Sequence, residues 1–365
     1  MLEPFSLIQY LWTEVGLDVG SAEVETFWKE HRARGTKWAM NTSENSFIPL
    51  GIYGDSCRVR QIAHQPVHKA LGIFLNCPLF RPRNSRASRW LVCTLDERLL
   101  YKHITLNKIF ARITWSLNCL WEDRFPSCGP NGETLEGKFR DRIGQQITGR
   151  RFQVVECRGD WLWHKQVFRF NSTWTAGKNK PVCFACPAYA VGDAKYYNIQ
   201  ESSPLWQRLY MFEQFLGVEM PPVGPSPLPL LRGFHHSCIA FCSMHCINLG
   251  LMYGCNGSCL MAVLEETDMF GRPDELSLQE RMDRAYLNFR AFCKAAKVPC
   301  SQPAFTVKLV VKKGGEILMT GKAYNNRCIQ LWLSSVMRVA AESYPAVERL
   351  AEMSVCMLPG CGGVD

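Results

Sequence analysis

The sequence predicts an α/β protein, in which strands and helices alternate along the chain. Apolar runs of strand length occur at 47–53, 70–77 and 152–156, and longer segments with helical spacing lie between and after them. This alternation favours a sheet flanked by helices over a helical bundle. The 365 residues are 47% hydrophobic and 21% charged, which is typical of a folded chain large enough for two domains.

Periodicity and turn residues predict the elements one by one. In chain order they are helices within 1–45, strands at 47–53 and 70–77, a helix over 98–121, a strand at 152–156, a Trp-rich helix from 161, a helix over 203–217, a strand leading into a buried helix between 233 and 264, helices over 276–297, a β-branched strand at 305–311 and helices over 325–356. The Pro- and Gly-rich stretch 125–132 separates the long helix from the next strand.

These elements suggest three parts. A helical N-terminal segment covers 1–45, an α/β core with a cysteine-rich insertion covers 46–320, and a helical tail covers 321–365. The N-terminus has no basic segment of the kind that begins a signal peptide, and we find no apolar run of the roughly 18 to 20 residues that a membrane span needs. We therefore expect an intracellular protein without a membrane partner.

The net charge of +9 favours an anionic partner without identifying it. Arg150 and Arg151 form one basic cluster, and Arg81, Arg83 and Arg86 form another. A stripe of arginines that contacts nucleic-acid phosphates and an ordinary solvated surface both fit these clusters.

Two Gly-Asp steps follow strand-like segments. Asp55 follows Gly54 after the first expected strand, and Asp160 follows Gly159 after the strand at 152–156. Carboxylates at the ends of neighbouring strands can hold Mg²⁺ ions that activate water and stabilise a leaving oxygen. Either aspartate taken alone is more typical of a turn or helix cap. The pair therefore remains a hypothesis for a catalytic site.

Four residues have spacings typical of zinc ligands. Cys183 and Cys186 form one Cys-x-x-Cys pair, and Cys242 and His245 form a Cys-x-x-His pair further along. Two such pairs can close a tetrahedral structural zinc site that joins distant segments. The alternative is a buried cluster of reduced cysteines, since the chain contains 18 of them, many in apolar stretches.

The order of these motifs resembles the catalytic region of cut-and-paste DNA transposases of the DDE/D type, above all the CACTA-type and related groups. The resemblance covers roughly 47–265 and rests on short motifs. It implies an RNase H-like mixed sheet flanked by helices, with a zinc-stapled insertion and helical additions at both ends. It also implies a DNA partner, catalytic Mg²⁺ and structural Zn²⁺, a nuclear location and a capacity for homo-oligomers.

Carried onto this chain, the resemblance makes Asp55 and Asp160 the first two catalytic acids. Cys183, Cys186, Cys242 and His245 match the zinc motifs, with Cys242 where many relatives have Asp. The third acid has no match: the glutamates considered for it are Glu265, Glu266, Glu342, Glu348 and Glu352.

Three hypotheses follow. The first is a metal-dependent enzyme that cleaves DNA phosphodiesters and transfers strands. The second is a catalytically inactive, zinc-containing protein, derived from a transposase, that binds DNA through Arg150 and Arg151 and through Arg81 to Arg86, or serves as an interaction module. The third is an unrelated protein whose cysteines are only buried.

Overall fold

The computed structural model describes residues 1–42, 44–60, 68–173, 181–189, 195, 198, 200, 209–221 and 224–357. The chain divides into two compact units, Met1–Phe241 and Cys242–Asp365. This division differs from the boundaries at residues 45 and 320 that the sequence suggests. Each unit is described by itself below.

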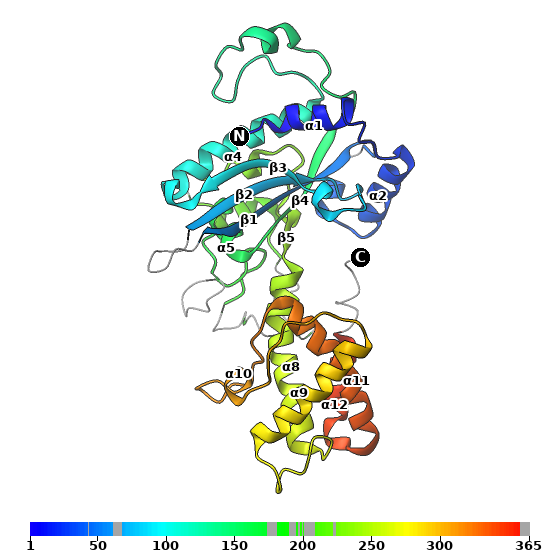
Figure 1. Cartoon of the computed structure of the whole chain (residues 1–365). Coiled ribbons are helices and arrows are strands. Elements are labelled where there is room, and N and C mark those ends of the chain that lie inside the picture. The colour runs from blue at the N-terminus through cyan, green and yellow to red at the C-terminus, as the bar shows by residue number, and fades with distance from the viewer. Residues whose placement is uncertain are drawn as a thin grey trace. The chain divides into compact units, whose positions relative to one another are not determined.

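The first unit is built on a five-stranded mixed sheet with the strand order β3-β2-β1-β4-β5 (Figure 1). The strands are β1 (Ile48–Arg60), β2 (His68–Asn76), β3 (Trp90–Asp96), β4 (Phe152–Gly159) and β5 (Ile239–Phe241). β2 is antiparallel to both β1 and β3, whereas β1, β4 and β5 run parallel. The expected α/β class and helix-flanked sheet are therefore confirmed.

The helices of this unit are α1 (Pro4–Thr13), α2 (Ser21–Ala33), α3 (Lys37–Met40), α4 (Lys102–Glu122), α5 (Trp161–Phe168) and α7 (Phe212–Glu219). Short 3₁₀ turns lie at Ser85–Ser88, Glu97–Leu99, Gly137–Arg142, Leu228–Leu230 and His236–Cys238. The helical N-terminal segment expected within 1–45 is present as α1 to α3. The long helix predicted over 98–121 is α4, which ends at Asp123 in the left-handed conformation.

Alternation along β1 explains which face of the sheet the helices cover. Ile48, Leu50 and Ile52 are all fully buried, and they share one face because successive side chains of a strand point to opposite sides. Gly54 lies on the same face, where it meets the indole of Trp163 from α5. α4 and α5 both contact β4, and α1 packs on α4, where the Phe5 backbone N–H donates to Ser116 Oγ at 2.9 Å.

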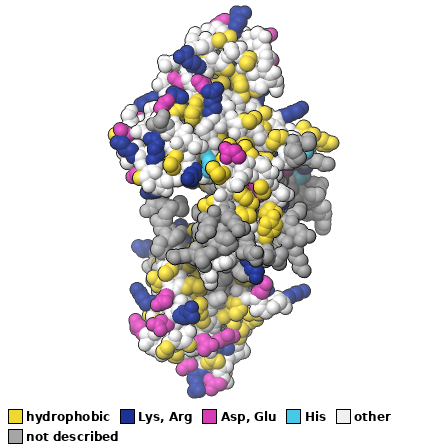
Figure 2. All heavy atoms as spheres, turned by 180° about the vertical axis from the view of Figure 1, so that it is seen from behind, with side chains coloured by type: hydrophobic (Ala, Val, Ile, Leu, Met, Phe, Trp, Pro, Cys, Tyr) yellow, Lys and Arg dark blue, Asp and Glu magenta, His cyan; other side chains and the backbone are white. Residues whose placement is uncertain are grey.

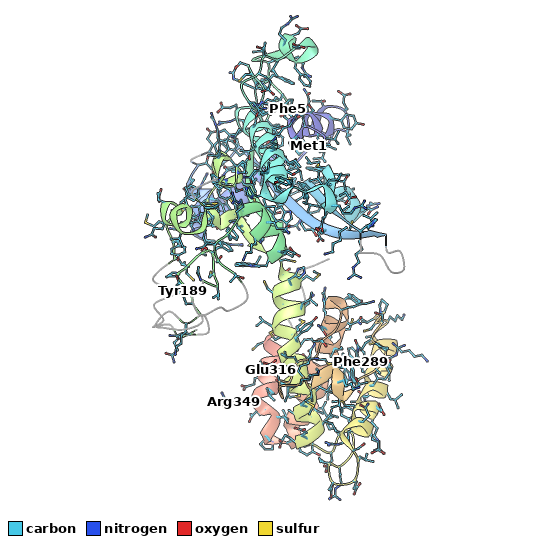
Figure 3. All side chains as sticks on the ribbon, turned by 90° about the vertical axis from the view of Figure 1, so that its left-hand side faces the viewer. Met1, Phe5, Tyr189, Phe289, Glu316 and Arg349 are labelled. Carbon is cyan, nitrogen blue, oxygen red and sulfur yellow. The ribbon has the colours of Figure 1, made fainter. Side chains whose placement is uncertain are left out.

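The second unit is helical. It consists of a π-helical segment η6 (Met244–Leu251), α8 (Met252–Glu266), α9 (Leu278–Ala295), α10 (Val307–Val310), α11 (Ala323–Ser343), the 3₁₀ turn Pro345–Val347 and α12 (Glu348–Cys356). Its core is aromatic and aliphatic, and Phe289, labelled in Figure 3, is fully buried beside Phe305 and Trp332. A capping box in which Ser277 and Glu280 exchange hydrogen bonds fixes the start of α9.

The strand predicted at 305–311 is wrong. Val307–Val310 form the helical turn α10, and only Val311 makes an isolated bridge, to Ile317. The Thr306 side chain accepts a hydrogen bond from the backbone N–H of Leu309, which caps the helical turn. Phe305 and Val310 are buried among helices, so this packing outweighs the β preference of the sequence.

One continuous helical stretch, Met244–Glu266, has the length and the mean hydropathy of 1.3 that would allow it to cross a membrane. Half of its most apolar 18-residue window is buried inside the protein, and the core helix of a folded protein can have the same composition. Met252, Cys259, Leu260 and Val263 are fully buried, which places this part of the helix in the core of the second unit.

Candidate functional site

Asp55 and Asp160 follow paired positions of two neighbouring parallel strands. Tyr53 of β1 is in register with Arg158 of β4, and Gly54 and Gly159 come next on each strand. The two aspartates directly follow this glycine pair. The expectation that β1 ends at Asp55 is wrong, because β1 continues to Arg60 in its pairing with β2. β4 ends at Gly159 as expected.

Both carboxylates already have hydrogen-bond partners. Asp55 is exposed, and its oxygens accept from Tyr53 Oη and from the backbone N–H of Ser56, each at 2.8 Å. Asp160 is half-buried and caps α5, because its Oδ1 accepts from the backbone N–H of Trp163 at 2.6 Å. Asp160 thus has a structural role as a helix cap, with one carboxylate oxygen outside that hydrogen bond.

Packing explains the two glycines. A Cβ on Gly54 would overlap the indole of Trp163, and a Cβ on Gly159 would lie 2.5 Å from Trp163 Cε3 and 3.1 Å from the Gly54 carbonyl oxygen. Trp163 is only 3% exposed, so it has little space to move. The absence of a side chain at Gly54 and Gly159 therefore lets the Trp163 indole pack directly against β1 and β4, next to the two aspartates in sequence.

The Cys183–Cys186 pair forms a compact thiol site in the first unit. The Cys183 sulfur accepts a hydrogen bond from the Cys186 thiol and another from the Ala185 backbone N–H at 3.3 Å. The Cys186 hydrogen bond lowers the pKa of Cys183 to about 7. The same interaction, together with burial, raises the pKa of Cys186. This hydrogen bond therefore favours the thiolate on Cys183 and the thiol on Cys186.

Aromatic packing holds this thiol site against the sheet end. The Phe184 ring, inside the Cys-x-x-Cys pair, lies 5.2 Å from the ring of Phe241, the last residue of β5. Trp161, which directly follows Asp160, is 6.1 Å from Phe184 and stacks on Phe241 at 6.2 Å. The Cys-x-x-Cys pair is therefore packed against Phe241, the residue that precedes Cys242.

Cys242 and His245 are themselves in contact at the start of the second unit. Cys242 Sγ and His245 Nδ1 lie 3.1 Å apart, and His245 is exposed on η6. A thiol and an imidazole nitrogen at this separation, and two hydrogen-bonded thiols in the other motif, have the chemistry of zinc ligands. Within the described residues, however, no three His, Cys, Asp or Glu side chains gather in a group that could hold a metal ion.

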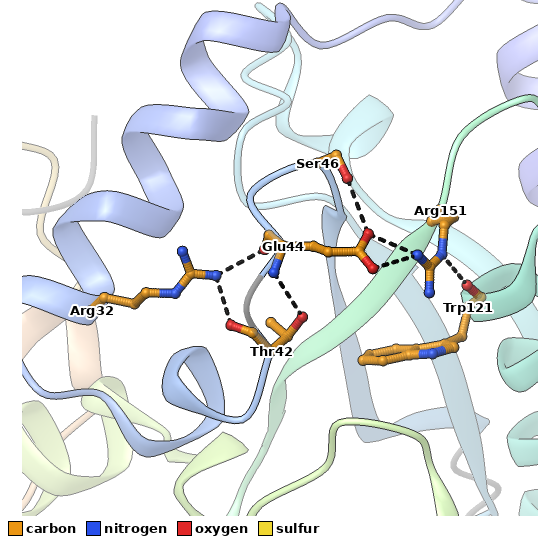
Figure 4. A network of polar contacts seen from close by, with 6 residues as sticks. All are labelled: Arg32, Thr42, Glu44, Ser46, Trp121 and Arg151. Atoms are coloured by element: carbon orange, nitrogen blue, oxygen red, sulfur yellow. Dashed lines mark hydrogen bonds and ion pairs between the residues drawn. The ribbon is translucent and has the colours of Figure 1, made fainter.

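Arg151 is engaged in structural contacts (Figure 4). Its Nη1 contacts both carboxylate oxygens of Glu44, at 2.7 and 2.8 Å, and its Nε donates to the Trp121 carbonyl at 2.9 Å. Its guanidinium also lies 4.3 Å from the Phe47 ring. Arg150 donates to Ser21 Oγ at 3.3 Å. Both arginines thus have partners within the first unit, and their predicted DNA contact stays a prediction.

A groove that the sequence did not reveal is lined by residues of α4 and of the end of α5. Its cavity measures about 470 Å³, and its lining includes Glu97, His103, Lys165 and Arg169. Glu97 accepts a hydrogen bond from the hydroxyl of Ser56, the residue after Asp55. Lys165 and Arg169 are one turn apart, at the end of the helix that Asp160 caps. Only the fold brings these groups together, so no local motif could have shown them.

Charge elsewhere is mixed. On the face drawn in Figure 2, Lys and Arg side chains are interspersed with Asp and Glu. The glutamates considered for the third acid all belong to the second unit, where Glu265 and Glu266 end α8 and Glu348 and Glu352 lie on α12. Glu97 is a carboxylate of the first unit, and its hydrogen bond with Ser56 links it to β1, the strand that contains Asp55.

A comparison of the chain with protein-family models found no match, and neither did a comparison with curated proteins.

Proposed function

We propose that the first unit is an RNase H-like core that acts on DNA phosphodiesters with Asp55 and Asp160 as its metal-binding acids. The observation that carries this proposal is the sheet. The order β3-β2-β1-β4-β5, with β2 antiparallel, makes a mixed, helix-flanked sheet, which is the kind of sheet that the resemblance to DDE/D-type transposases implies, and the two aspartates follow neighbouring glycines on the parallel strands β1 and β4. DNA is the partner under this proposal, and the protein would act in the nucleus.

Asp55 and Asp160 supply some of the oxygen ligands that a magnesium ion needs. Carboxylate oxygens are the ligands that Mg²⁺ prefers, and each aspartate brings oxygens to the end of a rigid strand. A magnesium ion bound there would lower the pKa of a bound water for attack on phosphorus. Tyr53 and Ser56 orient Asp55, and the cap to Trp163 orients Asp160.

Structural zinc is the second part of the proposal. Cys183, Cys186, Cys242 and His245 would be its ligands, and the contact between Phe184 and Phe241 supports it by tying the first motif to the residue before the second. Zinc would replace the proton that Cys186 shares with Cys183, since zinc binds thiolates. One zinc per chain by elemental analysis, absent from Cys183→Ser/Cys186→Ser, is the expected result.

Under this proposal the groove would hold a DNA phosphate. Lys165 and Arg169 supply cationic groups, and phosphate contacts of this kind position nucleic acid without reading its sequence. Glu97 also lines the groove and offsets one of these two positive charges, so the groove favours an anion only modestly. This placement assigns the backbone contact to α5 rather than to Arg150 and Arg151.

The experiment is nicking of supercoiled plasmid by the full chain with Mg²⁺ or Mn²⁺. Asp160→Asn is the decisive variant, because Asn caps helices as well as Asp and so preserves the structural role while removing the charge. Loss of a metal ligand worth several kcal/mol predicts a rate loss of at least about 100-fold for Asp55→Asn and Asp160→Asn. If either variant nicks at the wild-type rate, the assignment of that aspartate as a metal ligand is refuted.

A second candidate function follows because no third catalytic acid has been identified. Within the described residues no group of three possible metal ligands forms, and one oxygen of Asp160 is engaged in the helix cap. Both observations count against a catalytic metal site, and so favour a catalytically inactive protein, derived from a transposase, that binds DNA or serves as an interaction module. The first observation counts equally against the zinc site, so zinc in this alternative rests on the spacing of the ligands alone. DNA binding by wild type with no metal-dependent nicking would identify this role.

A further inference from the structure

Three thiols meet around Cys300 in the second unit. Cys293 lies on α9, Cys300 lies in the segment after that helix, and Cys328 lies on α11. The Cys293 and Cys328 thiols each make a hydrogen-bond contact with Cys300. The Cys300 thiol also donates to Asn325 Oδ1 at 3.5 Å. Two helices and a loop therefore bring three sulfur atoms to one place.

A cavity opens beside two of these thiols. Cys293 and Cys300 both line it, and its volume of about 780 Å³ is in the range of sites for small ligands. The cationic residues Arg290 and Lys294 are also part of its lining, and Arg290 Nη1 donates to the Cys300 carbonyl at 3.1 Å. None of the described residues that line this cavity is Asp or Glu. The cavity therefore suits an anionic ligand.

The three cysteines differ in how far solvent can reach them. Cys300 is half-buried, whereas Cys293 is 5% exposed and Cys328 only 1%. Burial raises the pKa of Cys293 and raises that of Cys328 to about 12, so both remain thiols near neutral pH. Thiols react as thiolates and only where a reagent can reach them. Cys300 is therefore the first point of attack, and the buried thiols can react only after it.

We propose that Cys300 is a thiol-exchange site for a small acidic disulfide of the glutathione type, and that Cys293 resolves the adduct. The Cys300 thiolate attacks one sulfur of glutathione disulfide, which breaks its S–S bond and releases one glutathione thiolate. Cys293 then gives up its proton and attacks the Cys300 sulfur, releasing the second glutathione as a thiol. Two protein thiols are oxidised to one disulfide, and glutathione disulfide is reduced to two thiols.

Cys293 is the resolving residue because it shares the cavity wall with Cys300, through which the leaving glutathione can depart. Cys328 lies on α11 and is not part of that wall. The new bond would tie the last turns of α9 to the segment that follows it. Arg290 and Lys294 would attract the carboxylates of the incoming disulfide.

The test treats the full chain with glutathione disulfide, blocks remaining thiols by alkylation and maps the peptides by mass spectrometry. Mixed disulfide should form first on Cys300, followed by a Cys293–Cys300 disulfide. Cys300→Ser should lose both products, and Cys293→Ser should accumulate the mixed disulfide. Cys356→Ser, which removes an exposed thiol of the same unit, should leave both products unchanged.

Charge recognition is tested separately. Lys294→Glu should slow the reaction with glutathione disulfide about tenfold, a change of roughly 1.4 kcal/mol, and leave the reaction with neutral 2-hydroxyethyl disulfide unaltered. Lys308→Glu, an exposed lysine on α10, is the charge-matched control. Prior modification of Cys356, a Cys300–Cys328 disulfide, or equal slowing by both lysine variants would overturn the proposal.

Discussion

Gly54→Ala should destabilise the first unit, although alanine adds only one methyl group. Its Cβ would overlap the indole of Trp163, which is 3% exposed and packed edge-to-face against Phe110 with ring centroids 6.3 Å apart. Overpacking a closed core costs about 1–3 kcal/mol. The indole has little room to move, so we expect a loss near the top of that range, about 3 kcal/mol.

Gly217→Ala is the matched control. Gly217 is exposed on α7, and a Cβ there would meet nothing within 4 Å. Alanine favours the helix over glycine by about 0.5–1 kcal/mol, so this variant should be stabilised. The same substitution therefore has opposite predicted effects at two positions of the same unit.

Urea unfolding followed by far-ultraviolet circular dichroism measures both variants. A double-mutant cycle with Trp163→Ala isolates the clash, because Gly54→Ala should cost less once the indole is gone. An unchanged unfolding midpoint for Gly54→Ala would refute the packing argument. An equal cost with and without the indole would also refute it, since the loss would then arise elsewhere in β1.

Three further predictions concern pH and charge. In protein stripped of metal by a chelator, alkylation of Cys183 should reach half of its maximal rate near pH 7, and Cys186→Ala should move that midpoint upward by removing the hydrogen bond that lowers the Cys183 pKa. Burial lowers the pKa of His164 to about 4, so its neutral form, present above pH 6.5, stabilises the fold. That stability should fall by up to about 1.4 kcal/mol per pH unit as the pH drops from 6.5 towards 4, and His164→Gln should flatten this dependence in acid unfolding. Lys165→Glu should weaken DNA binding and reduce the salt dependence by roughly one phosphate contact, whereas Lys29→Glu should not.

Local patterns predicted much of the first unit. β1, β4, α4 and α5 all begin within a few residues of their expected positions, because each has a clear period or a strong cap. The helical turn at 307–310 was missed because its sequence is β-branched and its helical state depends on burial between helices. Burial against distant segments cannot be read from a local pattern.

The candidate site shows the same limit. The Gly-Asp steps were visible in the sequence, but their reason was not, since Trp163 reaches both glycines only when β1 and β4 pair. Arg151 looked like an exposed DNA contact, whereas its partner Glu44 lies far away along the chain. The groove lined by Lys165 and Glu97 depends on two segments that no motif connects.

The segment after β5 separates the two candidate functions. From 242 to 264 it contains no Asp or Glu, and the first carboxylates, Glu265 and Glu266, close α8. At 1.5 Å per residue they lie about 20 Å along α8 from its first turn. The segment 242–264 thus supplies no third acid. Nicking activity would therefore require another carboxylate, for which Glu97 is the candidate because Ser56 links it to the strand of Asp55. If Glu97→Gln leaves nicking intact, that route fails; if wild type does not nick at all, the inactive role is favoured.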